Sequence, residues 1–219
     1  LHTSSRRQRQ MCIRDRSAYL SSQDYLDYPH PYHSTETTKG MVVSQNYLSS
    51  DIGAEILSKG GNAVDAAIAV GFSLTATLPR AGNIGGGGFM LVYDKKTESI
   101  ISFDFRSMSP KLATPDVYKV NGVHQYELSE EGYKAIAVPG TVAGLIEAHE
   151  MFGTMDLADL VNPTIELLKE GVPVTDDLYW AINDTESLKK DPESKKIYLA
   201  DEVIRGGKLF IEDLIKTME

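Results

Sequence analysis

The chain has 219 residues, of which 42% are hydrophobic and 24% are charged, as is typical of a globular protein with a buried core. The formal net charge of −9 argues against nucleic acid as a partner. No apolar run approaches the ~20 residues that a membrane span needs, so we expect none.

The first sixteen residues differ from the rest in charge, because they hold five arginines and a single acidic residue. Residues 6–15 resemble the translation of a sequencing-library adapter, so we expect residues 1–16 to be foreign to the protein. The alternative is a basic arm or the start of a signal peptide, but no apolar core of such a peptide follows. Without this segment, 17 basic and 30 acidic residues remain, and the only cysteine, Cys12, is lost.

Residues 17–38 are polar and contain two prolines, which favours an extended N-terminal arm. His30 and His33 lie in this arm with no cysteine or further histidine nearby, so we expect no metal site. Residues 39–219 read as one unit. We expect it to be truncated at the C-terminus, because a final helix over 212–219 ends the chain without a cap.

The first half of this unit predicts a short strand at 41–43 and two helices. Ser49 or Ser50 would cap the first helix, which runs to Leu57, and Asn62 would cap the second. The second helix is apolar on nearly every side, which predicts that it is buried, and Pro79 would close it.

A glycine-rich loop at 82–88 follows and leads into a predicted β-hairpin. We expect the strand 89–93 to be buried on both faces and the strand 100–105 to be half-buried. A run of four glycines indicates positive φ angles or a close approach of the backbone to another segment. A nucleotide loop is disfavoured, because no Lys-Ser or Lys-Thr follows and the order is helix, loop, strand.

The second half predicts a largely helical arrangement after an irregular stretch at 108–132. We expect a turn at Asn121-Gly122, a strand at 134–138 and a helix from Thr141. A helical stripe from Leu157 to Leu168 should break at Pro163. Gly171 and Pro173 should end this helical stripe. We also expect a helix capped by Asp176 or Asp177 and a polar loop over 188–208.

Arg106 is the candidate functional residue, because it lies at the end of a hairpin strand where a sheet opens to solvent. A planar guanidinium suits bidentate recognition of a carboxylate. From spacing alone, an ordinary surface ion pair is the favoured alternative. His149 is expected to pack on its helix, since no second histidine follows at the spacing of a zinc motif.

Four motifs together resemble the large subunit of γ-glutamyltransferases (glutathione hydrolases), and they occur in the order of that family. They are GGNAVDAA (60–67), GGGGFML (85–91), DFRSMSP (104–110) and VPGTVAG (138–144). The resemblance implies an α+β fold of the N-terminal nucleophile hydrolases, a four-layer αββα sandwich of two stacked sheets between helices. It also implies that this chain carries only the large-subunit part.

What the resemblance implies for function is transfer of a γ-glutamyl group from glutathione or another γ-glutamyl amide. The acceptor would be water, an amino acid or a peptide. A precursor would cleave itself, and the new N-terminal threonine of the small subunit would be the nucleophile. This chain would then hold no catalytic residue, no cofactor and no metal, and would be inactive alone. Arg106 matches the arginine that binds the substrate α-carboxylate. A periplasmic or extracellular location is expected.

One departure from the family pattern stands next to this arginine, where Ser107 replaces the usual glutamate. It keeps open an N-terminal nucleophile acylase that acts on another amide, such as a glutaryl side chain. A non-catalytic binding relative is the other alternative.

Overall fold

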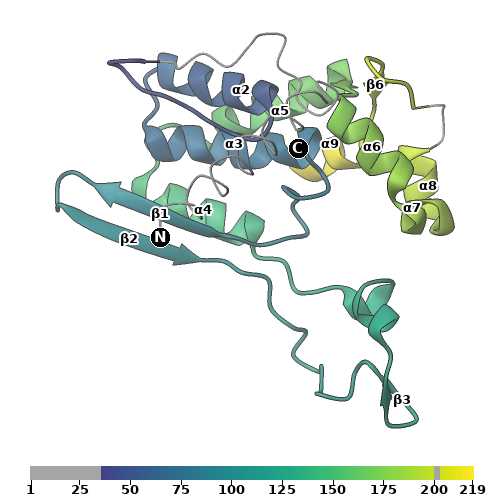
Figure 1. The fold of residues 1–219 in the computed structure, drawn as a ribbon. Helices are drawn as coiled ribbons and strands as arrows, with labels where there is room; N and C mark the ends of the chain where they lie inside the picture. The colour runs from purple at the N-terminus through teal and green to yellow at the C-terminus, as the bar shows by residue number, and fades with distance from the viewer. Residues whose placement is uncertain (1–35, 200–202) are drawn as a thin grey trace, which may run out of the picture.

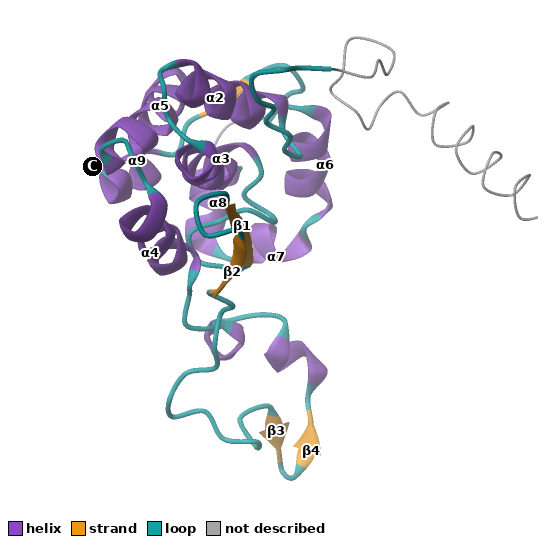
Figure 2. Ribbon diagram, turned by 90° about the vertical axis from the view of Figure 1, so that its left-hand side faces the viewer, coloured by secondary structure: helices purple, strands orange, loops and turns teal. Residues whose placement is uncertain are grey.

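The computed structural model describes residues 36–199 and 203–219. The segment 1–16 and nearly all of the arm expected over 17–38 lie outside these residues. In the described part, helices pack around one central helix, a β-hairpin lies against them, and a slender lobe extends away from this body (Figures 1 and 2).

Helix α3 (Ala63–Thr77) is the centre of the helical layer and packs against α2 (Tyr47–Ser58), α4 (Thr141–Phe152) and α5 (Leu157–Glu170). Ten of its fifteen residues are buried, which confirms the prediction from its apolar character. Neighbours on three sides leave little of this helix in contact with water.

The N-terminus of α3 is capped by Asn62, as predicted. The Asn62 side chain accepts hydrogen bonds from the amides of Val64 (2.7 Å) and Asp65 (2.9 Å), and Asp65 Oδ2 accepts from Asn62 N (2.8 Å). This reciprocal pair is a capping box. Asp65 is fully buried, and it also accepts from Thr154 N (2.9 Å) and Thr154 Oγ1 (2.5 Å) beyond the end of α4.

Helix α2 begins at Tyr47, and its cap lies three residues before Ser49 and four before Ser50, the two predicted caps. Asn46 is the N-cap and accepts from Leu48 N (3.0 Å), whereas Ser49 is buried inside the helix and bonds to Thr77 Oγ1 (2.8 Å). The strand predicted at 41–43 is wrong, since these residues are irregular. Val42 packs on the core, but within the described part of the chain no strand lies alongside to pair with this segment.

The predicted hairpin is present, with β1 (Phe89–Asp94) antiparallel to β2 (Ser99–Asp104). One face, with Met90, Val92, Ile101 and Phe103, packs against the helices. The other face is exposed, so the expectation that the first strand is buried on both sides is wrong for this structure. Four large apolar side chains are more than half exposed there: Phe89, Leu91, Tyr93 and Ile100.

Helix α5 is continuous through Pro163, so the break predicted there is wrong. A proline inside a helix removes one backbone hydrogen bond and crowds the preceding turn, at a cost of about 3 kcal/mol. Leu160, Ile165 and Leu168 are buried on both sides of the proline. Their burial, at about 1.5–3 kcal/mol for each side chain, outweighs that cost.

Residues 108–138 form the lobe. Its tip is a two-stranded ribbon of β3 (Lys119–Val120) and β4 (Val123–His124), joined by the predicted turn at Asn121-Gly122, where both φ angles are positive. Two short 3₁₀ helices follow, at Tyr126–Ser129 and Tyr133–Ala135. The strand predicted at 134–138 is therefore wrong, and only Val138 pairs, in an isolated bridge with Met108.

The C-terminal part packs around a second apolar cluster. Helix α6 (Asp176–Asp184) is capped by Thr175 rather than by Asp176 or Asp177, and β5 (Val172–Pro173) pairs with β6 (Lys208–Leu209). Gly171 ends α5 with φ 87°, as predicted. The last helix, α9 (Glu212–Met218), is also present.

Two short helices stand where a polar loop was predicted: α7 (Glu186–Lys190) and α8 (Pro192–Tyr198). Asp191 caps α8 by accepting from Ser194 N (2.7 Å), and Pro192 stands at the first helical position, which suits it. None of the helices in the described ranges is long and apolar enough to cross a membrane.

Candidate functional site

Three segments that are distant in sequence meet at the end of β2. Gly88 and Phe105 exchange two backbone hydrogen bonds (3.3 and 3.1 Å), which extend the hairpin ladder into the glycine-rich loop. The Gly86 carbonyl accepts from the amides of Gly140 (2.8 Å) and Thr141 (3.2 Å) at the start of α4. The backbone before Arg106 is therefore held by the loop on one side and by the start of a helix on the other.

The glycines in this loop serve close approach rather than special φ angles. None of the residues 85–88 has a positive φ angle, which rules out one of the two explanations expected from the sequence. A Cβ atom on Gly87 would overlap Ser107 N and lie 2.6 Å from Phe105 O. Only glycine lets the loop lie directly against the backbone that carries Arg106.

Helix α4 closes on the same segment from the other side, again through glycines. A Cβ atom on Gly140 would overlap the Phe105 carbonyl oxygen, and one on Gly144 would overlap the Phe105 ring. Phe105 is thus partly buried against α4, while the next residue, Arg106, is exposed. The structure places an exposed arginine on a tightly packed backbone.

The local geometry at Arg106 is set by its neighbours in sequence. Its backbone amide donates to Asp104 Oδ1 (3.0 Å), a side-chain turn that fixes the direction of the chain after β2. Its guanidinium Nη1 donates to Ser107 Oγ. Ser107 thus gives the Arg106 guanidinium a neutral acceptor, which does not balance its positive charge.

The arginines of the described part differ in their partners. Arg80 is paired with Asp177 (2.6 Å), and Arg205 with Asp176 (3.3 Å). The Arg106 guanidinium has no carboxylate oxygen within 4.0 Å among residues 36–199 and 203–219. The ordinary surface ion pair that spacing favoured is therefore absent from the described structure. A guanidinium without a carboxylate can accept one from a ligand.

Other candidate groups lie away from this point. His149 Nε2 is 2.7 Å from the Met155 carbonyl oxygen, so this histidine packs locally, as predicted. No cluster of three or more potential metal ligands occurs in the ranges that the structure describes, and His30 and His33 lie outside them. A groove of about 710 Å³ lies between α2 and α5, and neither Arg106 nor the glycine-rich loop lines it.

Two polar clusters in the described structure were not predicted from the sequence. One is the buried Asp65 carboxylate, whose place in a capping box could have been read from Asn62 and the residue three positions later. The other is the ion pair of Arg80 and Asp177, which are 97 residues apart. Nothing local in the sequence connects those two residues.

The family model described as Gamma-glutamyltranspeptidase matches residues 49–219. The chain is 40% identical over 184 residues to the glutathione hydrolase proenzyme of Bacillus subtilis (strain 168), a match of 82% of this chain and 31% of the relative. The chain is 37% identical over 193 residues to the glutathione hydrolase proenzyme of Escherichia coli (strain K12), a match of 86% of this chain and 33% of the relative. The chain thus spans about a third of the length of these curated relatives.

Solved structures give the same result. The γ-glutamyltranspeptidase of Helicobacter pylori superimposes with a TM-score of 0.80 at 36% identity, over 85% of this chain and 54% of that one. A cephalosporin acylase from Bacillus halodurans superimposes with a TM-score of 0.72 at 27% identity, over 88% of this chain and 38% of that one. The expected α+β fold of the N-terminal nucleophile hydrolases is confirmed, and the described residues contribute helices packed on one face of a hairpin. On the match of the family model and of these relatives, the chain belongs to the γ-glutamyltranspeptidase family.

Proposed function

We propose that this chain is the large-subunit part of a precursor that transfers γ-glutamyl groups. The donor is glutathione or another γ-glutamyl amide, and the acceptor is water, an amino acid or a peptide. Membership of the family supports this reaction, and curated relatives carry the name glutathione hydrolase proenzyme.

The proposed chemistry needs a nucleophile that this chain does not supply. A threonine hydroxyl at the N-terminus of the small subunit attacks the amide carbonyl, and its own α-amine takes the proton. The amine of the donor then leaves with a proton, and the acyl group remains as an ester of the threonine. Water or an acceptor amine attacks this ester and releases the threonine. Cleavage of the precursor must come first, because it frees the α-amine.

Arg106 is the residue of this chain to which we assign a substrate contact. The observation that carries the assignment is an exposed guanidinium with no carboxylate partner in the described structure, on a backbone packed between the glycine-rich loop and α4. Two parallel N–H donors fit the α-carboxylate of a γ-glutamyl group. A fixed backbone also limits the ordering that binding must achieve.

The exposed face of the hairpin supports a partner from the same precursor. Phe89, Leu91, Tyr93 and Ile100 form an apolar surface on one side of a two-stranded sheet. Two strands alone form a marginal sheet in water, and a further layer over such a face is the usual solution in stacked sheets. We assign the small subunit to this face, which would complete the sandwich.

An acylase is the second candidate, and Ser107 is the observation that favours it. The neutral hydroxyl next to Arg106 changes the acceptor available to the guanidinium, and with it the preference among acyl groups. Hydrolysis of a glutaryl amide in preference to a γ-glutamyl amide would select this alternative. A precursor that cleaves itself but turns over neither amide would instead support a binding relative.

The test replaces Arg106 in a full-length precursor that contains this chain. Removing one partner of a desolvated charged pair costs about 2–5 kcal/mol, so Arg106→Ala should lower kcat/KM about 30-fold to several thousand-fold. Arg106→Lys should recover only part, because an ammonium lacks the planar fork. Lys111→Ala, an exposed cation five residues along the chain, is the control and should leave kcat/KM unchanged.

Two readouts on the same protein separate binding from folding: subunit cleavage on a gel, and release from a γ-glutamyl anilide. Cleavage should survive in Arg106→Ala, since it does not use the substrate carboxylate. Normal turnover in the cleaved variant would contradict the assignment, and loss of cleavage would mean that Arg106 is structural. The 219-residue chain alone should release no anilide above a buffer blank.

A further inference from the structure

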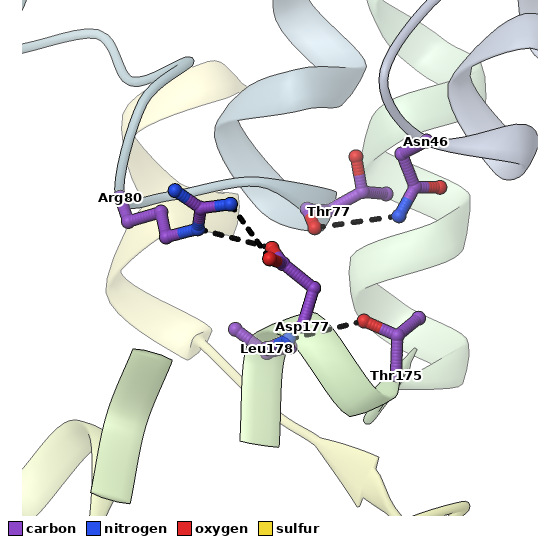
Figure 3. Close-up of polar contacts among 6 residues, drawn as sticks. All are labelled: Asn46, Thr77, Arg80, Thr175, Asp177 and Leu178. Carbon is purple, nitrogen blue, oxygen red and sulfur yellow. Dashed lines mark hydrogen bonds and ion pairs between the residues drawn. The ribbon is translucent and has the colours of Figure 1, made fainter. Parts of the chain in front are cut away.

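The ion pair between Arg80 and Asp177 adds a polar contact between the segment after α3 and helix α6, which also share an apolar cluster through Ala76 and Leu178. Arg80 lies between α3 and the glycine-rich loop, and Asp177 is the second residue of α6. The guanidinium binds as a fork, with Nε 3.0 Å from Oδ2 and Nη2 2.6 Å from Oδ1 (Figure 3). The N-terminus of α6, where Thr175 Oγ1 accepts from Leu178 N (3.2 Å), favours a carboxylate at this position.

Hydrogen bonds among the residues on either side of Arg80 connect the end of α3 to the glycine-rich loop. The Leu78 carbonyl accepts from the amides of Ala81 (3.0 Å) and Gly82 (2.8 Å). Asn83 Nδ2 donates to the Pro79 carbonyl (3.0 Å), and the Asn83 carbonyl accepts from Gly86 N (3.2 Å). The loop is therefore a series of tight turns, and a displacement at Arg80 is passed along it.

The end of α3 is held independently of this ion pair. Thr77 bonds to Ser49 through its hydroxyl (2.8 Å), and its carbonyl accepts from Asn46 Nδ2 (3.5 Å), as Figure 3 shows for Asn46. If the ion pair breaks, the helix stays in place and the loop after it loses its contact with α6, while its turn bonds to Leu78 and Pro79 remain. The far end of that loop lies against Phe105 and Ser107, on either side of Arg106.

We propose that Arg80 and Asp177 form a positioning pair for Arg106. They fix the near end of the glycine-rich loop, and the loop fixes the backbone that carries the substrate-binding guanidinium. Arg80 is not a second carboxylate site, because its fork is already occupied by Asp177. The two side chains are 45% and 35% exposed, so the pair contributes little to global stability. Its effect lies in the geometry of the loop.

The first test measures backbone hydrogen exchange in the 219-residue chain and does not depend on any activity. The reporters are the amides of Gly88 and Phe105, which bond to each other's carbonyls. In Arg80→Ala and Asp177→Asn, both should exchange roughly two- to fivefold faster, the range expected for loss of a well-formed exposed pair.

The matched control is Lys59→Ala, which breaks the exposed pair with Glu55 (2.7 Å) on α2. It should leave both reporters unchanged. Unchanged exchange at Gly88 and Phe105 in the Arg80 and Asp177 variants would overturn the proposal. A general rise in exchange rate across α3 and α5 would also overturn it, because that would indicate a loss of global stability and not a displacement of the loop.

The second test is kinetic, uses the full-length precursor and rests on the proposed function. Arg80→Ala should raise KM for a γ-glutamyl anilide roughly two- to fivefold with kcat within twofold and subunit cleavage intact. The charge-swapped double variant, Arg80→Asp with Asp177→Arg, should recover part of the loss.

The outcomes separate the two proposals. An unchanged KM in active single variants, or a double variant worse than both, would overturn the positioning role. A wild-type precursor that turns over no γ-glutamyl amide would contradict the proposed function, and hydrogen exchange would still decide the role of the pair.

Discussion

Asp65 is a buried carboxylate whose loss should destabilise the helical layer. It is 0% exposed and accepts from Asn62 N (2.8 Å), Thr154 N (2.9 Å) and Thr154 Oγ1 (2.5 Å). A hydrogen bond to a charged group contributes about 1.5–3 kcal/mol, and an unsatisfied buried donor costs about 1–3 kcal/mol. With the backbone donors of Asn62, Thr154 and Met155 left without this acceptor, Asp65→Ala should lower the free energy of unfolding by about 3–5 kcal/mol.

The assay is urea unfolding of the 219-residue chain, followed by far-UV circular dichroism and by tryptophan fluorescence. Trp180 is the only tryptophan, and it lies in α6, so the two signals together report on both apolar clusters. In thermal unfolding, the same loss lowers Tm by about 6–20 °C for a chain of this size. Asp51→Ala is the control, because Asp51 is exposed on α2, and its effect should stay within about 0.5 kcal/mol.

The pH dependence gives a second check with a definite sign. Burial raises the pKa of the Asp65 carboxyl, but the hydrogen bonds from Thr154, Asn62 and Met155 together outweigh burial and hold the pKa below its ordinary value of 3.8. A lowered pKa stabilises the fold above pH 3.8, and that contribution disappears as the pH falls through the folded-state pKa. The difference between wild type and Asp65→Asn should therefore narrow below about pH 4. An Asp65→Ala variant as stable as Asp51→Ala would refute this account.

Two further predictions concern the site. Gly87→Ala should cost about 1–3 kcal/mol of stability and lower turnover in the full-length precursor, because its Cβ would overlap the backbone of Ser107. The control is Gly85→Ala, whose Cβ would meet only the Asn83 side chain at 3.2 Å. It should lose less stability in thermal unfolding and less turnover in the anilide assay. Equal losses for the two alanines would contradict the close-approach explanation. Ser107→Ala removes the neutral acceptor of Arg106 and should lower kcat/KM by at most about tenfold, well below the effect of Arg106→Ala. A larger loss would mean that Ser107 itself contacts the substrate.

The features of the fold that depend on a few neighbouring residues were predicted correctly from the sequence. The Asn62 cap, the Asn121-Gly122 turn and the alternation of the second hairpin strand are properties of a few neighbouring residues, and all three are present. The predictions that failed depend on distant neighbours. Helix α5 survives Pro163 because the core buries residues on both sides of it, and Val138 lacks a strand because the lobe offers only a single bridge.

In the candidate site, too, the features set by neighbouring residues could be predicted, and those set by distant residues could not. Arg106 could be named from its place in a motif that resembles a known family, and the structure adds its lack of a carboxylate partner in the described residues. The ion pair of Arg80 and Asp177 could not be predicted, because no spacing rule links residues so far apart. The need for glycine was visible in the run 85–88, but its cause was not, since the contacting backbone comes from another segment.

The way the lobe is attached has a consequence for how its length can vary. Met108 and Val138 exchange both backbone hydrogen bonds (3.1 and 2.8 Å), so the lobe leaves and re-enters the body at one point. Residues paired in this way have Cα atoms about 5.5 Å apart, a distance that a two-residue hairpin turn closes. The thirty-one residues from Met108 to Val138 can thus lengthen or shrink without moving Arg106, because entropy of loop closure changes only slowly with loop length. The exposed ion pair between Glu131 of the lobe and Lys190 of α7 (3.7 Å) is the contact that such a change in length would alter.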